Sequence, residues 1–240
     1  MKKVWIDAGH GGKDPGAARN GLQEKDIALA VSLAIKSKLE NEYEGVQVLL
    51  SRSTDVFLEL KDRTNKANAA GADLLVSIHC NAGGGAGGFE TFRFTSASAA
   101  SRALQNVIHG EITTAIKPFN ITDRGQKTGN LHMCRESRMP AVLTENLFID
   151  VKSDADKLKQ AKVIEAIVSG HVSGIAKYLG LKKKEAATKA DALTVIVNGK
   201  NIDGVKLIDD VTYVPLRAVA EALGVNVDWN NNTKTATITN

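Results

Sequence analysis

The chain has 240 residues, of which 43% are hydrophobic and 24% are charged, and its formal net charge at pH 7 is +4. This composition is ordinary for a soluble globular protein that can bury a core of useful size. No basic stripe interleaved with aromatic residues occurs, which disfavours nucleic-acid binding, and without an apolar run of about 18 residues we expect no membrane span. The mild basic excess is compatible with a weak attraction to a polyanion such as a bacterial wall.

Over residues 1–180, segments with the pattern of strands alternate with segments with the pattern of helices. The pattern predicts strands at 3–8, 46–51, 74–79, 89–94 and 141–145, and helices at 24–42, 58–70, 98–117 and 161–179. The segment 89–94 alternates with period two, which predicts an edge or half-exposed strand. The order of elements predicts an α/β fold, with a mostly parallel twisted sheet flanked by helices on both faces. Ligands of such sheets bind beyond the carboxyl ends of the strands.

The composition changes after residue 180. Residues 181–192 are rich in Lys and Ala and have no buried pattern, which is typical of a linker. Residues 193–240 predict a small β-rich α+β domain, with one helix at 216–223 and a hairpin around the turn at 230–232. We therefore expect a domain over 1–180, a linker over 181–192 and a small module over 193–240 that lies near the lower size limit for independent folding.

Three residues of metal-binding type fall at one expected edge of the sheet. His10 ends the first strand, Glu24 opens the first helix and His79 ends the third strand. Two imidazoles and one carboxylate, with a fourth position open for water, form a recurring catalytic zinc set, and these donor atoms suit the borderline character of zinc. Asp7 could hold an imidazole in one tautomer, or it could be a structural residue at a strand end, and the sequence leaves both open.

Glu145 closes the apolar strand predicted at 141–145. A carboxylate in such a place is costly unless it is used or paired. Beside a metal-activated water it would serve as general base and then return the proton to the leaving amine. Zinc would lower the pKa of that water and polarise the scissile carbonyl. These residues suffice to hydrolyse an amide without a Ser or Cys nucleophile.

Four segments and two single residues follow one another in a recognisable order: Trp5–Ala17, Glu24, Arg63, Asn65–Ala82, Asp123–Lys127 and Arg135–Asp150. In this order they resemble the zinc-dependent N-acetylmuramoyl-L-alanine amidases of the type 3 class, over about residues 1–180. The resemblance implies hydrolysis of the amide between N-acetylmuramic acid and L-alanine in peptidoglycan. It also implies one zinc ion per chain and names the site residues, with His10, Glu24 and His79 as ligands and Glu145 as the catalytic carboxylate.

Other residues of the matched segments have open roles. Arg124 and Lys127 could meet stem-peptide carboxylates or the acyl oxygen, or could be solvated loop residues. Leu147 and Asp150 stand where the family usually has glycine and asparagine, which bears on loop shape and on the fit of the stem peptide. The glycine-rich run 83–88 predicts a loose connection between strands, with a flexible lip over the site as the alternative. We expect structural ion pairing for Arg63, and buried free thiols for Cys80 and Cys134.

The segment after residue 193 resembles a small domain of Gram-positive cell-surface proteins, often labelled copper-amine-oxidase N-terminal-like. The segment contains no histidine, cysteine or methionine, so the label does not imply copper. Its position after a linker indicates wall binding or anchoring, by analogy alone. A structural or dimerising module is the alternative.

The expected partner is bacterial peptidoglycan, with no nucleic acid, and the oligomeric state stays open. The first residues lack the pattern of a secretory signal peptide. We therefore expect a protein that stays cytoplasmic until it is released and then acts on the cell wall. A phage endolysin, with holin-type release, is favoured over a bacterial autolysin. A non-catalytic peptidoglycan-binding protein and a different zinc peptidase or amidase of the wall are the functional alternatives.

Overall fold

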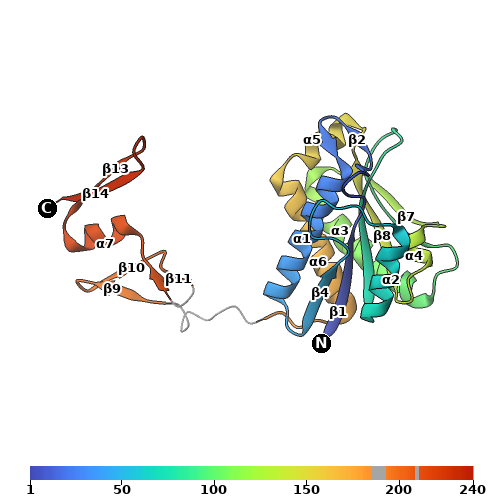
Figure 1. Cartoon of the computed structure of the whole chain (residues 1–240), viewed down its shortest axis with the longest axis horizontal. Coiled ribbons are helices and arrows are strands. Elements are labelled where there is room, and N and C mark those ends of the chain that lie inside the picture. The colour runs from blue at the N-terminus through green and yellow to red at the C-terminus, as the bar shows by residue number, and fades with distance from the viewer. Residues whose placement is uncertain (185–192, 209–210, 240) are drawn as a thin grey trace. The chain divides into compact units, whose positions relative to one another are not determined.

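The computed structural model describes residues 1–184, 193–208 and 211–239. The chain divides into two units, Met1–Lys184 and Glu185–Asn240 (Figure 1). Residues 181–184, expected in the linker, belong to the first unit, because the amide of Glu44 bonds to the carbonyl of Lys182 and the amide of Lys184 to that of Glu42. The rest of the expected linker, 185–192, lies outside the described residues.

A six-stranded sheet forms the centre of the first unit. Its strands lie in the order β4 (Val46–Leu50), β1 (Lys2–Ala8), β5 (Leu74–Asn81), β8 (Ala141–Phe148), β6 (Phe89–Phe94) and β7 (Asp123–Gly129). The first four strands run parallel to one another, β6 is antiparallel to β8, and β7 is parallel to β6. The predicted mostly parallel sheet is thereby confirmed. Of the two alternatives predicted for β6, the edge position is wrong, because β7 covers its outer side, whereas the second half of the strand is partly exposed.

Helices cover both faces of this sheet, as predicted (Figure 1). One face carries α1 (Glu24–Glu42), α3 (Ala99–Ile116) and α6 (Ala161–Leu179), and the other carries α2 (Leu60–Ala70) and the short α4 (His132–Arg135). The shorter elements are β2 (Ala18–Arg19), β3 (Leu22–Gln23), the 3-10 turn η1 (Lys117–Phe119) and α5 (Lys152–Leu158). Among the described residues, none of the helices is both long and apolar enough to span a bilayer.

The two faces of the central strand β5 differ in how they are covered. Val76 and Ile78 belong to the large core under α1, α3 and α6. Leu75 packs in a smaller cluster with residues of α2 and α4. Because side chains alternate along a strand, His79 lies on the same face as Leu75. The site is therefore built on the thinly covered face, where short helices leave room for a ligand.

Two strands extend farther than the pattern predicted. β5 continues to Asn81 and β8 to Phe148, so His79 and Glu145 lie inside their strands rather than at the ends. A register shift after His79 accommodates the extra residues. Leu147 adopts a left-handed conformation there, with φ of 69°, in the position for which the family pattern has glycine.

In the second unit, residues 193–208 and 211–239 form three two-stranded antiparallel sheets and one helix. Its elements are β9 (Val195–Val197), β10 (Lys200–Ile202), β11 (Lys206–Ile208), β12 (Val211–Tyr213), α7 (Leu216–Leu223), β13 (Asn226–Asn230) and β14 (Thr235–Thr239). The predicted helix and the predicted hairpin at the end of the chain are both present. Among its described residues, the buried hydrophobic side chains are Ile202, Ala220 and Ala222.

Candidate metal centre and catalytic carboxylate

The three predicted ligands come together at the carboxyl end of β1 and β5. Donor atoms of His10, Glu24 and His79 all lie within 4.8 Å of one another. Nε2 of His10 is 3.1 Å and Nδ1 of His79 is 2.9 Å from the same atom, Oε1 of Glu24. The two rings meet edge to face, with centroids 4.9 Å apart. The three side chains thus point at one small volume, as the metal hypothesis requires.

The turn after β1 orients His10. The residue has a φ of 58°, in the left-handed region, and Nη2 of Arg63 donates to its carbonyl oxygen at 2.6 Å. Oδ2 of Asp14 lies 2.8 Å from Nδ1 of the ring, which leaves Nε2 facing Glu24. A carboxylate on the outer nitrogen is the usual support of a metal-binding histidine. Sequence reasoning assigned no role to Asp14, although an acid four residues after a candidate ligand was a signal for it.

The backbone around the donors leaves no room for further side chains. A Cβ at Gly9 would lie 2.4 Å from Cε1 of His79, and one at Gly16 would lie 2.6 Å from Oε2 of Glu24. Both positions therefore require glycine so that the rings and the carboxylate can converge. The spacing and the donor types fit a zinc ion with one position left open.

The electrostatics of the cluster favour a bound cation. Burial acts to raise the pKa of Glu24, but hydrogen bonds from His10 and His79 outweigh it and hold that pKa well below its ordinary value. Burial likewise opposes charge on His10, yet Glu24 and Asp14 together raise its pKa to about 9. The buried carboxylate thus demands positive charge beside it. A divalent cation coordinated by neutral imidazoles supplies that charge.

Glu145 lies next to this cluster, on β8. Its backbone pairs with His79 on one side and with Glu90 on the other. Oε2 is buried and has no hydrogen-bond partner among the described residues. Burial first, and then the negative charges of Glu24 and Glu90, raise the pKa of Glu145 to about 7, against the opposing effect of His79. An unsatisfied buried carboxylate with a raised pKa is typical of a catalytic acid or base.

Asp7 takes the structural role of the two that the sequence left open. Its Oδ1 accepts from Nη1 of Arg63 at 3.0 Å, and its Oδ2 accepts from the hydroxyl of Ser77 at 2.7 Å. Arg63 also donates to the carbonyl of Ala8, so the predicted ion pairing of Arg63 is present. This buried pair supports the backbone that carries His10, whereas the carboxylate on the His10 imidazole belongs to Asp14.

Arg124 and Lys127 lie on β7 rather than in a loop. Nε of Arg124 donates to Oε2 of Glu90 at 2.7 Å, and Nζ of Lys127 donates to the same oxygen. Glu90 is almost fully buried, and sequence reasoning missed it. Its signal was weak, because a glutamate in an alternating strand is usually taken for a solvent-facing residue.

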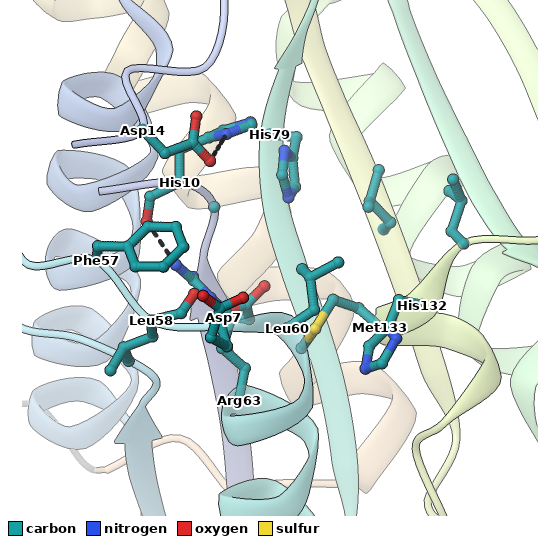
Figure 2. A pocket seen from close by; sticks show the side chains of 14 residues that line it. Asp7, His10, Asp14, Phe57, Leu58, Leu60, Arg63, His79, His132 and Met133 are labelled. Atoms are coloured by element: carbon teal, nitrogen blue, oxygen red, sulfur yellow. Dashed lines mark hydrogen bonds and ion pairs between the residues drawn. The ribbon is translucent and has the colours of Figure 1, made fainter. Parts of the chain in front are cut away.

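A pocket of about 450 Å³ adjoins the candidate metal ligands His10 and His79 (Figure 2). In Figure 2, His10 and His79 lie at one end of it, and Leu58, Leu60 and Met133 at the other. His132 also lines this pocket, and its Nε2 lies 3.2 Å from Oγ1 of Thr64. The other two histidines bond within the fold, His109 to Thr91 and Asp123, and His171 to Thr144. Both cysteines are buried and free.

The glycine run 83–88 is fastened by two acids. The amides of Gly83 and Gly84 donate to Oδ2 of Asp150, at 2.9 and 2.8 Å. The amide of Gly88 donates to Oδ2 of Asp154 at 2.7 Å. Asp150, which departs from the family pattern, is thus an acceptor for the loop backbone. These bonds favour the interpretation of the run as a connection between strands.

Comparison with known proteins shows the family of this chain. The family model described as N-acetylmuramoyl-L-alanine amidase matches residues 4–177, and the copper amine oxidase N-terminal domain matches residues 196–240. The sporulation-specific N-acetylmuramoyl-L-alanine amidase of Bacillus subtilis is 44% identical over 223 residues, which are 88% of this chain and 86% of the relative. The endolysin of Bacillus phage SPP1 is 52% identical over 189 residues, or 78% of this chain and 69% of the relative.

Solved structures give the same result. The catalytic domain of CwlV, an N-acetylmuramoyl-L-alanine amidase from Bacillus (Paenibacillus) polymyxa var. colistinus, is 38% identical with a TM-score of 0.71, over 76% of this chain and 100% of that one. An N-acetylmuramoyl-L-alanine amidase from Clostridium difficile 630 is 36% identical with a TM-score of 0.71, over 75% and 97%. The chain therefore belongs to the N-acetylmuramoyl-L-alanine amidase family.

Proposed function

We propose that this amidase hydrolyses the amide between N-acetylmuramic acid and L-alanine in bacterial peptidoglycan, with one zinc ion held by His10, Glu24 and His79. The observation that carries the proposal is the convergence of three donors within 4.8 Å beside Glu145, whose Oε2 has no partner among the described residues. The relatives named as amidases support the choice of substrate.

A zinc ion, when bound, lowers the pKa of water and polarises a carbonyl group. The chain prepares its site in three ways. Asp14 bonds to Nδ1 of His10, so that Nε2 stays available to coordinate a metal ion. Amides of Ala17 and Cys80 donate to the two oxygens of Glu24, at 2.9 and 3.0 Å, and fix the carboxylate. Gly9 and Gly16 leave the necessary space.

Glu145 performs the proton transfers. It takes a proton from the attacking water as the water oxygen bonds to the acyl carbon. It then delivers that proton to the amide nitrogen as the C–N bond breaks, which releases a lactyl carboxylate and the free amino group of L-alanine. A pKa of about 7 suits a group that must both accept and donate near neutral pH.

The products distinguish this function from its alternatives. We expect mass spectrometry of digested peptidoglycan to find stem peptides with a free L-alanine amino terminus. Cuts only within the stem peptide would instead identify another wall peptidase, and an unchanged wall would identify a binding protein. EDTA should abolish product formation and added zinc should restore it, whereas full activity of metal-free protein would refute the zinc site.

The second unit and the place of action complete the proposal. The unit at 193–240 binds or anchors to the wall, which its match to a small recurring domain supports by analogy. The protein acts on the cell wall as a phage endolysin or a bacterial autolysin, and relatives named as an endolysin and as a sporulation-specific amidase support either setting. Soluble wall fragments should inhibit lysis by competing with the intact wall for the protein, and this inhibition would test whether the protein acts on the wall.

A further inference from the structure

Two cations share one buried carboxylate on the Glu145 side of the metal centre. Oε2 of Glu90 accepts from Arg124 and from Lys127, and Oε1 accepts from Nδ2 of Asn81 at 2.7 Å. The Glu90 side chain is only 4% exposed. Both of its oxygens are thus satisfied, and its position is fixed from β5 as well as from β7. The three charged groups of this cluster carry a net charge of +1.

The two cations keep donors that face solvent. The side chain of Arg124 is 29% exposed and that of Lys127 is 37% exposed. Nε and Nη1 of Arg124 are used by Glu90 and by the carbonyl of Gly87, while Nη2 has no partner within the described part of the chain. Phe148 lies under the guanidinium, 4.7 Å from ring centre to Cζ, and limits its movement. The cations are therefore both fixed and available to a ligand.

Strand register brings this pair close to the reaction. Glu90 pairs directly with Glu145 across β6 and β8, and Lys127 pairs with Phe92 across β7 and β6. Directly paired residues project from the same face of a sheet. Glu90, Glu145 and His79 therefore form a row along one face, with the metal ligands at one end and the two cations beyond the other. The half of a substrate that extends from the candidate ligands past Glu145 along this row would meet these cations.

The chemistry of the substrate decides whether its sugar half or its peptide half meets the cations. The assignment rests on the proposed function. The sugar half carries hydroxyls and a neutral N-acetyl group, and its lactyl carboxyl is the acyl part of the scissile amide. Free carboxylates occur only on the stem peptide. Fixed cations with free N–H groups bind carboxylates through charge-assisted hydrogen bonds. We propose that Arg124 and Lys127, positioned by Glu90, bind a free carboxylate of the stem peptide.

The test compares two soluble muramoyl peptides that differ only in their stem carboxylates, free in one and amidated in the other. We expect the wild-type protein to have the lower KM for the free acid. Arg124→Gln and Lys127→Gln should each raise that KM roughly tenfold, since each removes a charge-assisted hydrogen bond to the carboxylate. KM for the amidated peptide and kcat for both should change by less than about twofold, because such a contact forms before the reaction and persists through it.

Two matched variants serve as controls. Lys127→Arg keeps the charge and should keep the preference for the free acid. Lys152→Gln removes an exposed cation of α5, whose partner is Asp156, and should change neither KM. If the Gln variants raise KM equally for both peptides, the two cations only hold Glu90 in place, and the proposal is overturned. Unchanged KM values in these variants would overturn it as well.

The test separates this proposal from the proposed function. Hydrolysis of neither peptide by the wild-type protein would count against the proposed function. Calorimetric titration with the intact acid and amide peptides would then still decide the carboxylate site. Tighter binding of the acid that is lost in Arg124→Gln would support the site, and equal binding of both peptides would overturn it.

Discussion

Oδ2 of Asp14 lies 2.8 Å from Nδ1 of His10, so a turn residue four positions along the chain orients the first candidate metal ligand. Such partners of a ligating histidine change metal affinity by about 10–100-fold when they are removed. We expect Asp14→Ala to weaken zinc binding by this factor, measured by competition with a chromophoric chelator. Asp156→Ala removes an exposed acid paired with Lys152 and should have no effect. Equal affinity in both variants would contradict the assigned role of Asp14.

Glu145→Gln should remove catalysis while it preserves the metal site. The substitution keeps the shape of the side chain but removes the group that transfers the proton, so we expect kcat to fall by about 10²–10⁴-fold. Zinc content, measured by atomic emission, should stay at one ion per chain. A variant that loses zinc together with activity would place Glu145 among the ligands, and a fully active variant would remove it from the mechanism.

The convergence of His10, Glu24 and His79 was predictable from sequence because it depends on local patterns and on one general rule of parallel sheets. Strong apolar strands ended near His10 and His79, and helix α1 began at Glu24. Such strand ends meet at one edge of the sheet, so their convergence followed from topology. Gly9 and Gly16 leave the space that the three side chains need, and the role of Gly16 followed from no sequence pattern.

Glu90 and strand β7 were not predictable, because their state depends on pairing with distant segments. The segment Asp123–Gly129 reads D-R-G-Q-K-T-G and contains few residues that favour strands. It becomes a strand because β6 offers it a hydrogen-bonding edge. Because of this pairing, β6 is an interior strand of the sheet rather than its edge, and Glu90 is buried beside two cations. Long-range pairing thus overrode local propensity in β7 and set the burial of β6.

His171 should make stability depend on pH on the acid side. The ring is fully buried in α6, and burial lowers its pKa to about 4, whereas an unfolded chain has a histidine pKa near 6.5. The unfolded state therefore binds more protons between these values, and stability is lost as pH falls from about 6.5 to 4. Over this whole pH range, the contribution of His171 would lower the free energy of unfolding by about 3 kcal/mol.

The matched variant is His171→Gln, which can keep a hydrogen bond to Thr144 but does not titrate. Urea unfolding at several pH values should show a shallower acid-side slope for this variant than for the wild-type protein. The difference between the two curves isolates His171 from His10 and His79, which titrate in both proteins. Parallel curves across this window would show that His171 is not held neutral by burial.

Leu147 combines a fully buried side chain with a φ of 69°. A left-handed conformation costs a non-glycine residue roughly 1–2 kcal/mol. Leu147→Ala should therefore lose about 2–5 kcal/mol of unfolding free energy, because it removes the buried side chain and keeps the strain. Leu147→Gly removes the strain as well and should be at least as stable as Leu147→Ala.

The control for this order of stabilities lies on the same strand. Val142 is fully buried in the same core and is not among the residues with positive φ. There we expect the usual order, with Val142→Gly less stable than Val142→Ala by roughly 0.5–1 kcal/mol. Chemical unfolding of the four variants measures both pairs. The same order at both positions would show that Leu147 carries no backbone strain.

Removal of residues 185–240 should separate wall binding from catalysis. The first unit contains every residue of the candidate site, and the CwlV catalytic domain aligns over its full length without a counterpart to the second unit. We expect the shortened protein to cut soluble muramoyl peptides with unchanged kcat and KM, and to sediment less with intact walls. Pull-down is best measured in a Glu145→Gln background, so that the walls stay undegraded. Undiminished sedimentation would assign wall binding to the catalytic unit itself and leave the second unit with a structural or dimerising role.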